Sequence, residues 1–135
     1  MDVVYDLETY PNCFTYSDVT VDGEVWNQFE ISERADDTEE LLAHLRNLVI
    51  NKHKMIGYNN RGFDYTLIHY IIGEATEAKK LGAKVSISSR QLYREAQKMF
   101  ERSEEERRFP VVRDGDVVIP QVDLFLIHHF DNIAW

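Results

Sequence analysis

A short run near the amino terminus, residues 3–8 (VVYDLE), constrains the fold more than any other part of the sequence. The run predicts a short buried strand, and side chains alternate between the two faces of a strand. Asp6 and Glu8 are therefore expected on one face, and Tyr5 and Leu7 on the other. Two like charges this close on a mostly apolar strand are costly unless a cation neutralises them, and oxygen ligands suit Mg²⁺ or Mn²⁺. The pair is either part of a divalent-metal site or two solvated acids at a strand end.

A second stretch, residues 55–64, predicts a strand, a turn rich in Asn and Gly, and a helix that begins at Phe63. Asp64 falls in the first turn of that helix, where the helix dipole favours a carboxylate. A strand–turn–helix unit can bring this carboxylate over the edge of the sheet at which Asp6 and Glu8 also lie. Three acids are therefore expected to converge.

The rest of the pattern predicts an α/β domain that opens with three antiparallel strands. Pro11 with Asn12 and Asp22 with Gly23 are turn signals between the first three strands. The predicted strands are 3–8, 13–21, 24–31, 55–58 and one near Val122. Four helices are predicted: one that begins near residue 36, one over 63–72, one from 89 to about 108, and one that follows Val122. Between these elements we expect a connector with a short helical piece at 74–89 and a small ribbon that pairs 111–112 with 117–119.

Length and composition limit the class of protein. The 135 residues are enough for one domain with a core of its own, so we expect a single domain over 1–135. No apolar run approaches the ~20 residues of a membrane helix, and the amino terminus has no signal pattern, which favours a soluble intracellular protein without a membrane partner. The single cysteine, Cys13, excludes an internal disulfide. The net charge of −9 argues against nucleic-acid binding, although acids gathered at a metal site would explain part of it.

The two acidic stretches contain the patterns Asp6-x-Glu8 and Asn60-x-x-Phe63-Asp64. Together they resemble the first two motifs of the DEDD 3′-to-5′ exonucleases. The surrounding residues, at 5–12 and 122–124, are most similar to the proofreading domain of family B DNA polymerases, especially those of phages. The resemblance implies a ribonuclease-H-like α/β fold: a mixed sheet with an antiparallel amino-terminal meander and flanking helices. It also implies the cytoplasm of a bacterium or of a phage-infected host cell.

The same resemblance implies two-metal hydrolysis of the 3′-terminal phosphodiester of single-stranded DNA, with two Mg²⁺ or Mn²⁺ ions about 3.5 to 4 Å apart. Asp6 would bridge the ions, Glu8 would hold the ion that activates water, and Asp64 would contribute to the second ion. The implied substrate-binding residues are Leu7, Asn60 and Phe63, of which Asn60 would hydrogen-bond the terminal nucleotide. The implied partners are the 3′ end of single-stranded DNA and the remainder of a DNA polymerase chain.

The third motif of the family, a Tyr or His followed by a fourth metal-binding Asp, is missing. His128, His129 and Asp131 do not have the required spacing. Asp123 matches an Asp that family B sequences carry here, and we expect it to support the site rather than bind metal. We therefore expect the chain to be the amino-terminal part of an exonuclease domain, and to be weakly active or inactive alone.

Two other functions fit the same residues. One is a non-catalytic module of this fold that binds nucleic acid or a protein, which an acidic chain without the third motif would suit. The other is a different metal-dependent nuclease of the same fold class, acting on RNA or branched DNA. No residue that senses a 2′-hydroxyl is identifiable in the sequence, so DNA and RNA substrates stay open.

Overall fold

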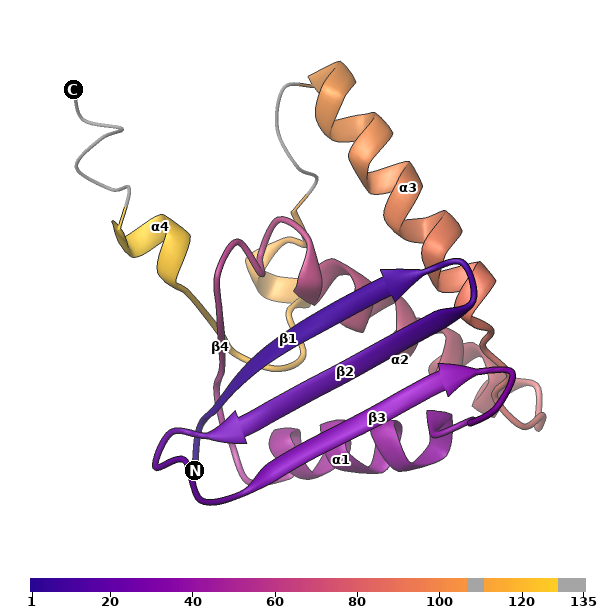
Figure 1. The fold of residues 1–135 in the computed structure, drawn as a ribbon, viewed down its shortest axis with the longest axis horizontal. Helices are drawn as coiled ribbons and strands as arrows, with labels where there is room; N and C mark the ends of the chain where they lie inside the picture. The colour runs from indigo at the N-terminus through magenta and orange to yellow at the C-terminus, as the bar shows by residue number, and fades with distance from the viewer. Residues whose placement is uncertain (107–110, 129–135) are drawn as a thin grey trace.

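The computed structural model describes residues 1–106 and 111–128, which form a five-stranded mixed sheet with helices packed on it (Figure 1). The strands are β1 (Val3–Tyr10), β2 (Cys13–Thr20), β3 (Trp26–Ser32), β4 (Met55–Gly57) and β5 (Gln121–Asp123). The helices are α1 (Thr38–Ile50), α2 (Asp64–Lys80), α3 (Ser89–Glu106) and α4 (Leu124–His128), and a short 3₁₀ helix, η1, spans Asp114–Asp116. Among the described residues no helix is long and apolar enough to cross a membrane.

The sheet has the strand order β3-β2-β1-β4-β5. Strands β1, β2 and β3 form an antiparallel meander, and its second turn contains Gly23 with a φ of 78°, a left-handed conformation that glycine adopts without strain. Strands β4 and β5 add in parallel beside β1, because each follows a connection that crosses the sheet. The prediction of an α/β chain with a mixed sheet and an antiparallel amino-terminal meander is therefore confirmed.

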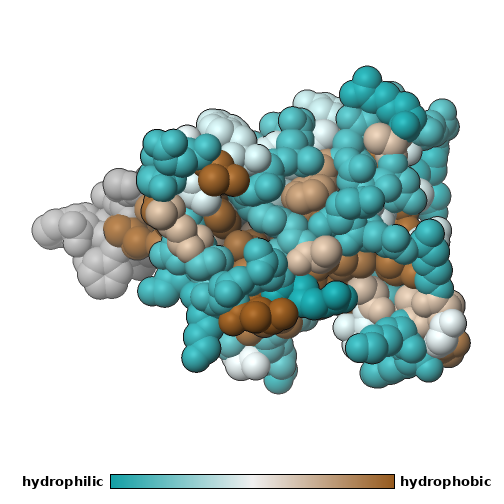
Figure 2. All heavy atoms as spheres, turned by 90° about the horizontal axis from the view of Figure 1, so that it is seen from below, coloured by the Kyte–Doolittle hydropathy of each residue, from teal (hydrophilic) through white to brown (hydrophobic). Residues whose placement is uncertain are grey.

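One face of the sheet carries the core. Val3, Tyr5 and Leu7 of β1 are buried, while the alternating residues Asp6 and Glu8 are exposed on the other face. Figure 1 shows α1 and α2 behind the strands, and α3 lies beside the carboxyl end of β1. Seen from below in Figure 2, the surface of the molecule is largely hydrophilic, with hydrophobic side chains in separate patches. The acids of β1 therefore lie on the side of the sheet opposite the core.

A buried polar network joins α1 to the meander. The carboxylate of Asp18 accepts hydrogen bonds from the Tyr16 hydroxyl (2.6 Å) and the Asn27 amide (3.1 Å), and His44 Nε2 of α1 lies 2.5 Å from it. Burial alone would raise the pKa of Asp18, but these hydrogen bonds hold it below its usual value. The network fixes α1 at one position over the sheet.

Two predicted segments differ in the structure. Helix α2 continues to Lys80, so only residues 81–88 form the connector that was predicted for 74–89. The short helical piece expected there is the last part of α2, where Ala75 and Ala78 are partly buried and Lys79 is exposed.

The predicted ribbon of 111–112 with 117–119 is wrong. The carbonyl of Val112 accepts a hydrogen bond from Arg61 (2.6 Å), and the amide of Val118 donates to the Tyr65 hydroxyl (2.7 Å). These backbone groups are bonded to side chains near the start of α2, and η1 occupies the place of the predicted tight turn. The predicted end of the third helix near residue 108 lies outside the described residues.

Candidate active site

The first two predicted acids are accessible on β1. Asp6 and Glu8 are both exposed, and the intervening Leu7 is buried against the helical layer, which confirms the predicted alternation. The strand register places Ser17 opposite Asp6 and Thr15 opposite Glu8. Both carboxylates therefore face solvent beside small polar side chains.

The third acid, Asp64, is the first residue of α2, and its side chain is only 8% exposed. The preceding turn positions it: Asn59 has a φ of 55°, which asparagine tolerates, and the amide of Tyr65 donates to the carbonyl of Asn60 at 2.7 Å. Burial is the main reason that the pKa of Asp64 rises from 3.8 to about 7, and the negative charges of Asp6, Glu8 and Asp123 raise it further. The structure thus brings the three predicted acids within range of one another's charge.

The donor set suits a hard divalent cation. Every candidate ligand is a carboxylate, and a cation would offset the repulsion that raises the pKa of Asp64. In residues 1–106 and 111–128, however, no three Asp, Glu, His or Cys side chains lie close enough together to hold one metal ion. Asp6, Glu8 and Asp64 are electrostatically coupled here without forming a closed coordination shell.

Asp123 supports the turn before Asp64. Its buried carboxylate accepts hydrogen bonds from the backbone amides of Asn59 (2.8 Å), Arg61 (3.1 Å) and Phe125 (3.0 Å). The carboxylate therefore ties β5 to the turn that leads into α2, and it also caps the start of α4. This arrangement confirms the prediction that Asp123 is a supporting residue.

Asn60 lies in the core. Its side chain is fully buried, and its amide donates to Gln121 Oε1 (2.7 Å), which also accepts from the Tyr5 hydroxyl (2.8 Å). A Cβ at Gly57 would lie 3.0 Å from the Asn60 side chain, so glycine allows this close approach without a shift of Asn60. The prediction that Asn60 contacts the terminal nucleotide does not fit this burial. Asn60 instead holds the turn before Asp64 against β5.

A cavity with both apolar and polar walls lies beside Glu8. It has a volume of about 480 Å³, and its apolar walls include Leu7, Phe63 and the α3 side chains Tyr93 and Phe100, while Thr9, Gln97 and Glu101 are polar. The rings of Phe63 and Phe100 lie 5.1 Å apart. The predicted residues Leu7 and Phe63 are thus brought together next to an acid. The α3 residues were missed by the sequence analysis, and the signal that could have found them is the separation of Tyr93 and Phe100 by seven residues, two helical turns.

The histidines and the aspartate nearest to a third motif lie at the carboxyl end of the chain. His128 is the last residue of α4, and His129 and Asp131 lie outside the described residues. The other helical histidine near the site, His69, contacts the Tyr65 hydroxyl through Nδ1 at 3.2 Å. His69 is therefore part of the packing around α2.

Comparison of the chain with protein-family models, with curated proteins and with solved structures found no match in any of the three. The functional assignment therefore rests on the residues and geometry of the site itself.

Proposed function

We propose that the chain has a ribonuclease-H-like fold and carries the first two metal-binding motifs of a 3′-to-5′ exonuclease domain of the family B DNA polymerase type. The proposed reaction is hydrolysis of the 3′-terminal phosphodiester of single-stranded DNA. The observation that carries the proposal is the coupling of Asp64, desolvated at the start of α2, to the two exposed acids of β1. The strand order, with an antiparallel meander followed by parallel strands beside β1, supports the same fold.

Asp6, Glu8 and Asp64 would hold two Mg²⁺ or Mn²⁺ ions near the carboxyl end of β1, the central strand of the sheet. When bound, such ions supply an activated water and stabilise the leaving oxygen in phosphodiester hydrolysis. Asp6 and Glu8 are already exposed to an incoming ligand, whereas Asp64 must give up the proton that its raised pKa favours. Asp123 would act as a positioning residue, because its oxygens accept hydrogen bonds from three backbone amides.

The cavity beside Glu8 suits the terminal base of a single strand. Phe63 and Phe100 offer aromatic faces on which a base can stack without regard to its identity, and Leu7 and Tyr93 extend the apolar wall. The position of this cavity next to Glu8 would set the terminal phosphodiester beside the acids. The chain's excess of acids over bases suggests that much of the phosphate-binding surface belongs to the remainder of a polymerase chain.

The test is degradation of a 3′-labelled single strand under single-turnover conditions with excess protein and Mn²⁺. We expect slow removal of 3′ nucleotides by the parent, and at least a hundredfold slower removal by Asp6→Asn and by Glu8→Gln. The exposed residue Glu33 provides a matched control, and Glu33→Gln should retain the parent rate. Degradation that survives Asp6→Asn unchanged would refute the assignment.

A non-catalytic module of the same fold is the second candidate. It is favoured by the open arrangement of the acids, since no three of them in the described residues form a metal-holding group. A folded chain that binds no Mn²⁺ and degrades no strand would support this candidate over the first.

A further inference from the structure

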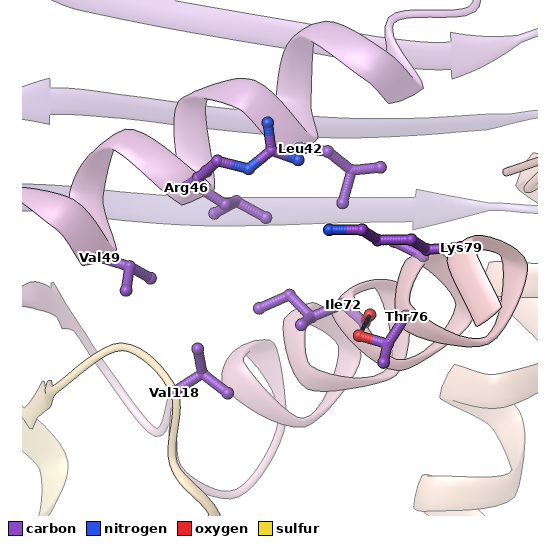
Figure 3. Close-up of a pocket in the computed structure, with 9 residues that line it drawn as sticks. Leu42, Arg46, Val49, Ile72, Thr76, Lys79 and Val118 are labelled. Carbon is purple, nitrogen blue, oxygen red and sulfur yellow. Dashed lines mark hydrogen bonds between the residues drawn. The ribbon is translucent and has the colours of Figure 1, made fainter. Parts of the chain in front are cut away.

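A second surface feature lies in the helical layer, on the opposite side of the sheet from the exposed acids of β1. It is a groove of about 300 Å³ between α1 and α2. Its apolar lining is Leu42, Leu45, Val49, Ile72 and Val118, of which Val118 comes from the segment before β5. In Figure 3 the residues of α1 and α2 face one another across the groove, and Val118 closes the end near Val49 and Ile72. The groove is separate from the candidate active site.

Two cations border this apolar groove. Arg46 of α1 and Lys79 of α2 are exposed, and Figure 3 shows their charged ends pointing toward one another over the groove. Within the part of the chain that the structure describes, neither forms an ion pair with a carboxylate. The chain has 24 acidic residues against 15 Lys and Arg, yet none of the described residues that line this groove is acidic. Two like charges that converge in this way favour an anion between them.

The length of the groove matches two turns of a helix. Its walls span residues 42–49 of α1 and 72–79 of α2, seven steps in each case, or about 10 Å at 1.5 Å per residue. Helices that bind in grooves use apolar anchors at positions i, i+3 or i+4, and i+7, which cover the same length. The next residue of α1 after Val49, Ile50, is also apolar and is 69% exposed. These features favour an extended helical ligand over a compact small molecule.

We propose that this groove binds an acidic amphipathic helix of a partner protein. Apolar side chains of the partner lie between α1 and α2, and one of its carboxylates sits between Arg46 and Lys79. The net charge of −9 makes binding of an acidic helix specific for this groove. Most of the surface repels such a helix, whereas the two cations at the groove attract it. The proposal does not depend on the proposed nuclease activity.

The test uses two synthetic amphipathic peptides with the same leucine stripe, one with glutamate on its remaining faces and one with lysine in place of every glutamate. Affinity is measured by fluorescence anisotropy, and the binding site is located by amide chemical shifts of the ¹⁵N-labelled chain. We expect the acidic peptide to bind with shifts confined to α1, α2 and the segment around Val118. The double variant Arg46→Glu, Lys79→Glu should lower its affinity at least tenfold and raise that of the basic peptide.

The matched control is Arg90→Glu with Arg94→Glu, which changes the net charge equally at two exposed positions of α3. This control should leave the specific shifts in α1 and α2 in place. Equal binding of both peptides, or shifts spread over the sheet, would overturn the proposal. Binding of decanoate without binding of the acidic peptide would assign the groove to small apolar anions instead, and concentration-dependent self-association with the same shifts would assign it to a second copy of the chain. The Asp6→Ala variant should bind the acidic peptide as the parent does. Failure of the nuclease assignment can therefore be distinguished from failure of the groove assignment.

Discussion

Replacing Asp64 with asparagine removes a buried charge that lies within range of three other carboxylates. The folded chain holds this charge at a cost, because burial and the charges of Asp6, Glu8 and Asp123 raise the pKa of Asp64 from 3.8 to about 7. We therefore expect Asp64→Asn to make the metal-free chain more stable while removing a candidate metal ligand. Such a gain in stability is expected when a site residue keeps a functional charge in a buried position at the expense of its hydration.

The size and the sign of the effect follow from linkage. A rise of about three pKa units corresponds to about 4 kcal/mol, at about 1.4 kcal/mol per unit. The raised pKa already includes the favourable interaction of the charge with the start of α2, so the expected gain for asparagine above pH 7 is about 4 kcal/mol. Between pH 4 and pH 7 the folded parent binds more protons at Asp64 than the unfolded chain does, so its stability falls as pH rises. The difference between parent and variant should shrink toward zero near pH 4.

Urea denaturation in EDTA, followed by circular dichroism at pH 5 and pH 8, measures this difference. Asp116→Asn is the matched control, because Asp116 is exposed, and its free energy of unfolding should stay within about 0.5 kcal/mol of the parent at both pH values. A variant Asp64→Asn that is no more stable than the parent at pH 8 would show that the charge is not held at a cost. The electrostatic coupling of the three acids would then be refuted.

Three further substitutions test the fold around the site. Asp18→Asn should lower the free energy of unfolding by about 2 kcal/mol at neutral pH. Because the folded-state pKa of Asp18 is lowered, only the parent should lose this stabilisation as pH falls below about 4. Urea titrations of the parent, of this variant and of His44→Gln measure the difference. Asp123→Ala leaves the amides around turn 59–61 without their acceptor and should cost about 3 kcal/mol, with faster hydrogen exchange of those amides than in the parent. Leu67→Ala opens a cavity under α2 and should lower the free energy of unfolding by about 3 kcal/mol, whereas a change below 1 kcal/mol would contradict the buried position.

The local part of the fold was predictable because it depends on alternation and turn chemistry. Asp6 and Glu8 share a face of β1 because every strand alternates its side chains, and α2 begins within one residue of the predicted Phe63. The supporting role of Asp123 was also predicted, although its three amide donors were not. These features can be predicted from short stretches of sequence alone.

The rest depends on contacts between residues that are far apart in the chain. The burial of Asn60 follows from its bond to Gln121, 61 residues later, and no local pattern indicates it. The segment at 111–119 was predicted to pair with itself, but Arg61 and Tyr65 bind its backbone instead. Likewise, a helix from residue 89 was predicted, but the aromatic contribution of α3 to the cavity beside Glu8 depends on where that helix packs.

The central claim is that Asp6, Glu8 and Asp64 form a site for divalent metal. The most direct test is calorimetric titration of Mn²⁺ into the parent chain and into Asp6→Ala with Glu8→Ala, after circular dichroism has shown that both are folded. We predict saturable binding to the parent and loss of that binding in the double variant. Equal binding to both proteins, or no binding to a folded parent, would contradict the claim.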